Sequence, residues 1–175
     1  INDVEYRKVL LDADFQADAG EVLAAADEKT KEIWICSPNN PTGNLIYEET
    51  ILELLTRFSG IVVVDEAYID FASEKSFLSK LAGFQNLIVL QTFSKAWGSA
   101  AIRLGMAFAS KEIISVFNKI KYPYNVNLLT QEKALEMLKN GNEVRKWVEA
   151  TLMEREFMLA ELAKLKMVQH IYPTD

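Results

Sequence analysis

Four consecutive apolar residues precede two carboxylates in the stretch Ile61-Val62-Val63-Val64-Asp65-Glu66-Ala67-Tyr68. A short run that is apolar on both faces is typical of a strand buried inside a parallel sheet. Similar runs occupy residues 33–36 and 87–90, and residues 104–109 predict a further strand of this kind. Between the first two runs, apolar residues recur at helical spacing from 47 to 58. This alternation predicts an α/β fold, a three-layer αβα sandwich around a mostly parallel sheet.

Helical patterns dominate the second half of the chain. They cover residues 111–121, 128–139 and 143–166. The last of these alternates charged and apolar positions along its whole length. A helix of that length often connects two domains, so we expect this segment to leave the first domain.

The composition limits the class of protein. The chain has 175 residues, of which 50% are hydrophobic and 25% charged, with a formal net charge of -6. These values suit a globular domain and exclude the disordered and fibrous classes. The acidic balance argues against a nucleic-acid partner, and no apolar run approaches the ~20 residues that a membrane helix needs. With one cysteine and one histidine, we expect neither a disulfide framework nor a Cys/His metal centre.

Unusual side chains follow three of the predicted strands. Residues 39–43 (Asn-Asn-Pro-Thr-Gly) follow the first, residues 65–68 (Asp-Glu-Ala-Tyr) the second, and residues 92–95 (Thr-Phe-Ser-Lys) the third. Parallel strands bring their carboxyl ends to one edge of a sheet, where α/β proteins bind ligands. We therefore expect these three segments to form one site.

Lys95 follows a turn that is rich in hydroxyl groups. An isolated lysine is most often a solvated surface residue, whereas a nucleophilic lysine needs partial burial and a cationic neighbour that lower its pKa. Thr92 and Ser94 precede this lysine, and Arg103 lies further along the chain. Hydroxyls, an arginine and the N-terminus of a helix expected near Lys95 are together typical of a phosphate site. The pattern predicts a lysine beside a bound phosphate.

Asp65 ends an entirely apolar strand, where burying a carboxylate is costly unless a cation meets it. A helix cap or a turn would equally explain an aspartate at this point. A protonated pyridine nitrogen would suit it as a partner, because holding that proton makes the ring an electron sink. Tyr68 and Asn40 could then offer a phenol and an amide to a hydroxyl on the same ring, although Asn-Pro alone indicates only a turn. Ala67 is small enough for a flat ring to lie against it.

Taken together, these segments resemble a known family. Residues 37–43 and 65–68, with the Ser-Lys pair and the arginine of the third segment, are similar to the large domain of fold-type I aminotransferases that use pyridoxal 5′-phosphate. More narrowly, residues 36–43, 64–71 and 92–96 resemble the histidinol-phosphate aminotransferases. The resemblance extends over nearly the whole chain. It is therefore more specific than any single motif.

The resemblance implies a role for each residue of the site. Lys95 would be the catalytic residue and would form the Schiff base with the cofactor aldehyde, while Asp65 would pair with the pyridine nitrogen. The remaining cofactor contacts would come from Asn40, Ala67, Tyr68, Thr92, Ser94 and Arg103. Tyr124 matches a family tyrosine near the substrate. Trp97 and Ala101 depart from the family's phenylalanine and glycine but leave the lysine and the arginine in register.

By the same resemblance, the reaction would convert L-histidinol phosphate and 2-oxoglutarate to imidazole acetol phosphate and L-glutamate in histidine biosynthesis. The family also implies a homodimer in the cytoplasm, with no nucleic acid or membrane as partner. Threonine-phosphate decarboxylases and aromatic aminotransferases share much of this core. Both activities therefore stay open as alternatives.

The resemblance also implies a division of the chain. Residues 1–128 would be part of the large cofactor-binding domain, and residues 129–175 would be interdomain helices and the beginning of an incomplete small domain. The chain begins at Ile1 rather than at a methionine and is shorter than the family, so we expect an internal fragment with little turnover of its own. A non-catalytic truncated domain therefore stays open as well.

Overall fold

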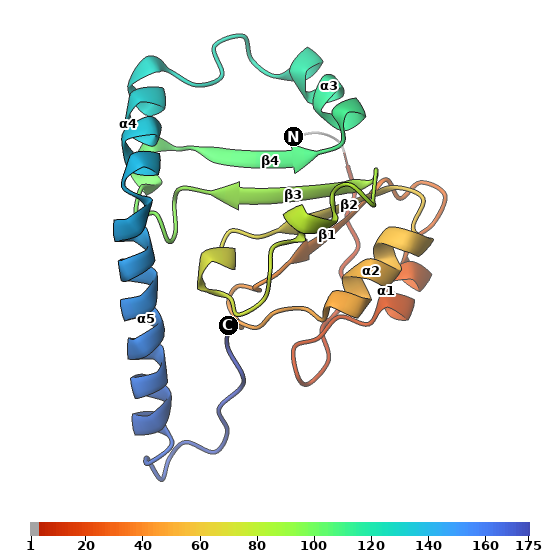
Figure 1. Cartoon of the computed structure of the whole chain (residues 1–175). Coiled ribbons are helices and arrows are strands. Elements are labelled where there is room, and N and C mark those ends of the chain that lie inside the picture. Colours follow the sequence, from red (N-terminus) through yellow and green to blue (C-terminus); the bar gives the residue numbers. More distant parts are fainter. Residues whose placement is uncertain (1–3) are drawn as a thin grey trace.

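The computed structural model describes residues 4–175, and its strands form one mixed sheet (Figure 1). The strands are β1 (Glu32–Cys36), β2 (Ile61–Asp65), β3 (Leu87–Thr92) and β4 (Gly105–Ala109), and they lie side by side in this order. β1, β2 and β3 are parallel to one another, whereas β4 is antiparallel to β3. The predicted α/β fold with a mostly parallel sheet is confirmed.

The direction of β4 differs from the prediction that residues 104–109 form another parallel strand. Parallel neighbours are joined by a crossover that is usually an α-helix. The connection from β3 to β4 carries only a short 3-10 helix, Ala100–Ile102. The Phe93 N–H donates to the Leu104 carbonyl (3.2 Å), so the chain folds back beside the strand that it has just left.

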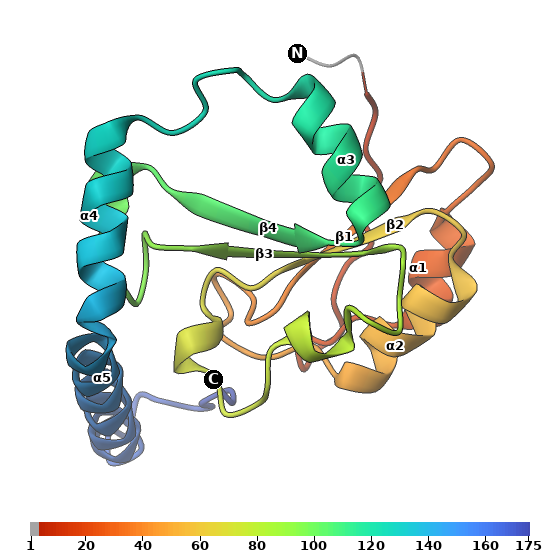
Figure 2. The same cartoon turned by 45° about the horizontal axis from the view of Figure 1, so that its top comes forward.

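The sheet has two unlike faces, because side chains alternate along each strand. One face packs against α1 (Ala19–Ala25) and α2 (Glu48–Arg57), which lie on the same side of the sheet in Figure 2. The buried side chains of this face are Ile33, Ile35, Val62, Val64, Leu87 and Val89. By alternation and register, Asp65 and Thr92 belong to the opposite face. Trp34 shares that face and is 61% exposed, while Val63 and Ile88 beside it are buried, so this face is open only in part.

The second half of the chain forms α3 (Lys111–Ile120), α4 (Leu128–Lys139) and α5 (Gly141–Leu162), close to the predicted helical ranges. α4 and α5 follow one another along one side of the molecule (Figure 1). None of the helices within residues 4–175 is both long enough and apolar enough to cross a membrane. The chain after α5 returns to the loop that follows β1 in the sequence, where the Asp175 N–H donates to the Gly43 carbonyl (2.7 Å).

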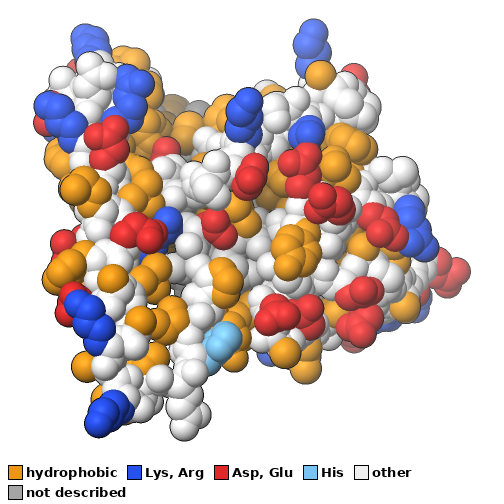
Figure 3. Space-filling view, turned by 60° about the horizontal axis from the view of Figure 1, so that its bottom comes forward, with side chains coloured by type: hydrophobic (Ala, Val, Ile, Leu, Met, Phe, Trp, Pro, Cys, Tyr) orange, Lys and Arg blue, Asp and Glu red, His pale blue; other side chains and the backbone are white. Residues whose placement is uncertain are grey.

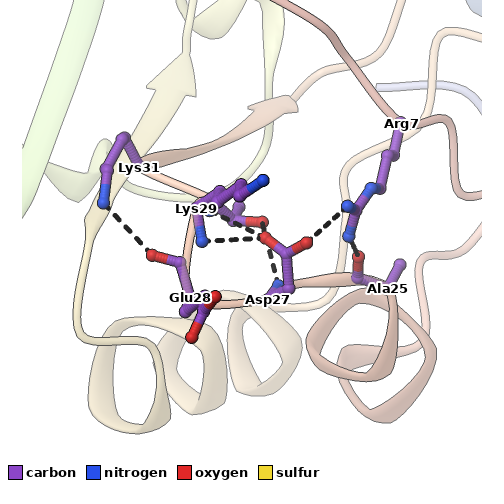
Figure 4. Close-up of polar contacts among 7 residues, drawn as sticks. Arg7, Ala25, Asp27, Glu28, Lys29 and Lys31 are labelled. Atoms are coloured by element: carbon purple, nitrogen blue, oxygen red, sulfur yellow. Dashed lines mark hydrogen bonds and ion pairs between the residues drawn. The ribbon is translucent and has the colours of Figure 1, made fainter.

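An exposed ion pair attaches the segment before α1 to the loop after it (Figure 4). Arg7 donates from Nη1 to the Ala25 carbonyl (2.7 Å) and from Nη2 to Asp27 Oδ2 (2.5 Å). The hydrogen bond from Arg7 is the main reason why the pKa of Asp27 is lowered to about 2. Because the folded-state pKa is the lower one, this contribution to stability is present above the ordinary pKa of 3.8 and is lost as the pH falls through about 2.

Candidate active site

The carboxyl ends of β1, β2 and β3 meet at one edge of the sheet. Cys36 is in register with Asp65, and Asp65 with Leu90. The Ser37 N–H donates to the Asp65 carbonyl (2.9 Å) and the Glu66 N–H to the Leu90 carbonyl (2.9 Å). Pairing therefore continues to the start of each loop, and the predicted meeting of the strand ends is found.

The Tyr68 phenol joins side chains from all three loops. Asn40 Nδ2 donates to the phenol oxygen at 2.8 Å. Lys95 Nζ, from the third loop, lies 4.9 Å from the centroid of the Tyr68 ring. The Lys95 ammonium and, less strongly, the Asn40 amide lower the pKa of Tyr68, because both stabilise its phenolate. Three residues that are far apart in the sequence thus converge on one oxygen-bearing ring.

The turn that carries Lys95 differs from the prediction. No helix begins at this residue, and its side chain is exposed rather than partly buried. The Gly98 N–H donates to the Lys95 carbonyl (2.8 Å), and Gly98 has a φ of 62°, which closes a tight turn. The expectation of a helix N-terminus at this point was therefore wrong.

Thr92 and Ser94 share the same turn. Thr92 Oγ1 accepts the Ser94 N–H at 3.0 Å and donates to the Leu104 carbonyl at 3.2 Å. Arg103, at the other end of this connection, has a φ of 52° and donates from Nη1 to the Ala100 carbonyl at 2.9 Å. Thr92 and Ser94 are thus linked through the Ser94 backbone, whereas the Arg103 guanidinium is hydrogen-bonded within its own turn.

Asp65 lines a cavity of about 410 Å³ together with Ala67 and Thr92. Its Oδ1 also accepts the Ala67 N–H at 3.0 Å, so the turn-forming role expected of an aspartate at this point is realised too. Asn40 and Tyr68 line a second cavity of about 220 Å³. The consecutive residues Ala67 and Tyr68 thus each line a different one of these two cavities.

Tyr124 is not brought to this site. It lies in the connection between α3 and α4 and is 96% exposed. Both cavities at the strand ends are lined by other residues. The tyrosine that the resemblance placed near the substrate is therefore separate from the residues that the structure assembles.

Sequence reasoning missed the most deeply buried carboxylate of the region. Glu66 is 1% exposed, and its carboxylate accepts hydrogen bonds from Ser76, Phe77 and Gln91. One signal was available, because strand alternation places residue 66 on the face opposite Asp65, toward the core. Its partners Ser76 and Phe77 lie in a loop whose path no periodicity reveals.

Comparison with known proteins gives the family. The model for "Aminotransferase class I and II" matches residues 1–173. The chain belongs to the class I and II aminotransferases. A histidinol-phosphate aminotransferase of Bacteroides fragilis is 56% identical to this aminotransferase chain over all 175 residues, which cover 51% of that relative. The chain thus spans about half the length of the curated relatives that it matches.

Solved structures support the same fold. The histidinol-phosphate aminotransferase from Sinorhizobium meliloti in complex with pyridoxal-5′-phosphate has a TM-score of 0.73 and 24% identity, covering 81% of this chain and 40% of that one. The L-threonine-O-3-phosphate decarboxylase from Porphyromonas gingivalis has a TM-score of 0.69 and 29% identity, covering 89% and 49%. The predicted aminotransferase family and its fold are confirmed, while the roles of single residues stay predictions.

Proposed function

We propose that this aminotransferase chain carries the cofactor-binding part of a pyridoxal-phosphate enzyme that moves the amino group of L-histidinol phosphate to 2-oxoglutarate. The observation that carries this proposal is the convergence of Asn40, Tyr68 and Lys95 beside the cavity lined by Asp65 and Thr92. The 56% identity to a histidinol-phosphate aminotransferase supports the choice of amino donor.

The residues at the sheet edge fit pyridoxal phosphate in their chemistry. Asp65 offers a carboxylate for a protonated ring nitrogen. Asn40 and Tyr68 already bond each other at 2.8 Å, so both can reach a single ring oxygen. Hydroxyls at Thr92 and Ser94 and a guanidinium at residue 103 suit a phosphate. A cavity of about 410 Å³ has room for an aromatic ring between the carboxylate and the first hydroxyl.

When bound, the cofactor supplies a protonated pyridine ring that draws electrons away from the α-carbon of an amino substrate. Lys95 supplies the amine that removes a proton from that carbon and returns it, as a general base and then a general acid. Asp65 keeps the ring nitrogen protonated by its charge. Lys95 and Asn40 lower the pKa of Tyr68, which makes its phenol a stronger hydrogen-bond donor to the ring oxygen. Amino donor and oxo acid would react in turn, giving ping-pong kinetics.

The wider assignments belong to the same proposal. Residues 1–128 would form part of the large domain, and residues 129–175 the interdomain helices and the start of a small domain. The exposed apolar residues of α4, such as Leu129 at 76% and Leu135 at 60%, support a homodimer. Cytoplasmic residence is proposed from the resemblance alone. Threonine-phosphate decarboxylation is the second candidate, because such an enzyme is 29% identical and shares the fold.

The cofactor assignment is tested by titrating the chain, in the longest form that its gene encodes, with pyridoxal phosphate. We expect a visible absorption band of the bound cofactor that disappears in Lys95→Ala, because the lysine amine forms the covalent link. Lys119→Ala, which removes an exposed lysine of α3, is the matched control and should keep the band. A band of equal intensity in Lys95→Ala would overturn the assignment.

The substrate is tested separately by offering histidinol phosphate, threonine phosphate and phenylalanine side by side, each with 2-oxoglutarate. We expect glutamate to form fastest with histidinol phosphate. Release of carbon dioxide from threonine phosphate would instead favour the decarboxylase, even if the cofactor binds as proposed.

A further inference from the structure

Glu66 forms a hydrogen-bond cluster beneath the candidate site. Its Oε1 accepts the Phe77 N–H at 2.7 Å. Its Oε2 accepts the Ser76 hydroxyl at 2.5 Å and Gln91 Nε2 at 2.9 Å. Gln91 Nε2 also lies 3.2 Å from the Ser76 oxygen. With three donors on two oxygens and 1% exposure, this carboxylate meets the conditions under which a buried charge is tolerated.

The cluster ties together the ends of two strands. Glu66 directly follows Asp65 at the end of β2, and Gln91 directly precedes Thr92 at the end of β3. Because side chains alternate, Glu66 and Gln91 share the face turned toward the core, while Asp65 and Thr92 share the open face. Glu66 and Gln91 are thus each the chain neighbour of a residue that lines the larger cavity, and the half-buried Gln91 borders that cavity itself.

Asp65 and Thr92 are not paired with each other, since Asp65 is in register with Leu90 and Thr92 with Gly105. The backbone hydrogen bond from the Glu66 N–H to the Leu90 carbonyl (2.9 Å) continues the β2–β3 pairing one residue past the end of β2. The Glu66–Gln91 bond is the side-chain link just past this point, and Ser76 and Phe77 fix it from a third segment. A buried carboxylate with fixed donors has little freedom to move, so its chain neighbours have little freedom either.

We propose that Glu66 and Gln91 are positioning residues that set the separation between Asp65 and Thr92, and thereby between the ring-nitrogen end and the phosphate end of the cofactor. The inference rests on the proposed function, since it assumes that these two residues hold the two ends of pyridoxal phosphate. Glu66 lines neither cavity and acts through its peptide bond to Asp65, whereas Gln91 also borders the larger cavity.

The test measures pyridoxal-phosphate affinity and the pH titration of the bound cofactor's visible band in the longest form of the protein that its gene encodes. Gln91→Leu keeps the side chain's size and removes one donor to a charged acceptor, for which we expect about tenfold weaker cofactor binding. We also expect the midpoint of the pH titration to move, because Asp65 is no longer held against the ring nitrogen. Glu66→Gln, which keeps the shape of the residue, should act in the same direction.

Two further variants separate positioning from stability. The exchange Glu66→Gln with Gln91→Glu rebuilds an amide–carboxylate pair in the opposite sense and should recover most of the lost affinity. Val62→Ala removes a fully buried side chain at the other end of β2 and should lower stability without altering the cofactor's affinity or titration. Unchanged cofactor binding in both Gln91→Leu and Glu66→Gln would overturn the inference, as would an equal loss in Val62→Ala. If the parent protein does not bind pyridoxal phosphate, the proposed function fails first and this inference with it.

Discussion

The sheet and the α4–α5 segment are both rich in apolar residues, yet they use them differently. Val62, Leu87 and Val89 of the sheet are fully buried, whereas Leu129 of α4 is 76% exposed and Met153 of α5 is 75% exposed. Figure 3 shows hydrophobic side chains along the outside of these helices. The sheet therefore has its own core, while α4 and α5 leave apolar surface for something else to cover.

This difference matters for the candidate site, because its residues follow the strands of the sheet, which has its own buried core. Asp65 and Thr92 end strands whose neighbours are buried, and Asp65 is paired in register with Leu90, two residues before Thr92. The α5 residues Thr151, Leu152 and Arg155 reach only the smaller cavity. The larger cavity is thus bordered by the sheet and its loops, and the smaller one also by α5.

The largest expected effect contrasts one leucine from each part. Leu54 of α2 is fully buried against the sheet, so Leu54→Ala should lower the free energy of unfolding by about 2–5 kcal/mol, through lost burial and the cavity left behind. Leu135 of α4 is 60% exposed, so Leu135→Ala should change the free energy of unfolding by less than about 0.5 kcal/mol. Urea unfolding of both variants measures the contrast.

Equal losses in the two variants would contradict the comparison, because they would mean that Leu135 is buried by a partner in solution. Repeating the unfolding at several protein concentrations identifies that case, since stability that depends on association rises with concentration.

A smaller effect concerns two glycines with positive φ. Gly98 has a φ of 62° and open space around it, so Gly98→Ala should cost about 1–2 kcal/mol of stability from backbone strain alone. Gly43 has a φ of 82°, and a methyl group there would also collide with the Thr174 hydroxyl. Gly43→Ala should therefore cost at least ~1 kcal/mol more. Thermal unfolding of the two variants gives the difference.

The collision can be removed separately. Thr174→Ala takes away the nearest atom but keeps a Cβ 3.3 Å away, so Gly43→Ala should cost less stability in the Thr174→Ala background than in the parent chain. If Gly43→Ala loses as much stability in the Thr174→Ala background as in the parent chain, the segment after α5 does not pack against the loop that follows β1.

The sequence predicted the parts of the fold that depend on local pattern. The runs at 61–64 and 87–90 are apolar on both faces, and such runs form strands wherever a sheet can bury them. Parallel pairing then made the meeting of residues 40, 68 and 95 predictable, since each follows a strand end. These predictions needed only periodicity and one rule of sheet geometry.

The remaining features depend on contacts that no local pattern encodes. β4 turned back because its connection carries no crossover helix, and Gly98 closed a turn where a helix start was expected. The Glu66 cluster depends on Ser76 and Phe77 arriving from a loop, and the return of Asp175 to Gly43 joins residues more than 130 positions apart. Such contacts form only between segments that the complete fold brings together, so no local sequence pattern predicts them.

The smallest expected effect concerns the pKa of Tyr68 in the exposed candidate site. Lys95→Met should raise the pKa of Tyr68 toward its ordinary value of 10.0, because the nearby ammonium is the main cause of the lowering. Asn40→Ala should raise it less, by removing the 2.8 Å hydrogen bond to the phenol oxygen. Absorbance titration of each variant, with a Tyr68→Phe titration subtracted, isolates this phenol from the other tyrosines.

Salt and a neighbouring asparagine provide the controls for the Tyr68 titration. Added salt should raise the pKa in the parent chain, because it screens the exposed Lys95 charge, but should have little effect once that charge is gone. Asn39→Ala should leave the pKa unchanged, since Asn39 Nδ2 donates to Thr42 Oγ1 instead. Because the folded-state pKa is the lower one, the stabilisation is present above the ordinary pKa and is lost as the pH falls through the folded value. A salt-independent pKa would mean that Lys95 does not lie beside the Tyr68 ring, and the convergence on which the proposed function rests would be lost.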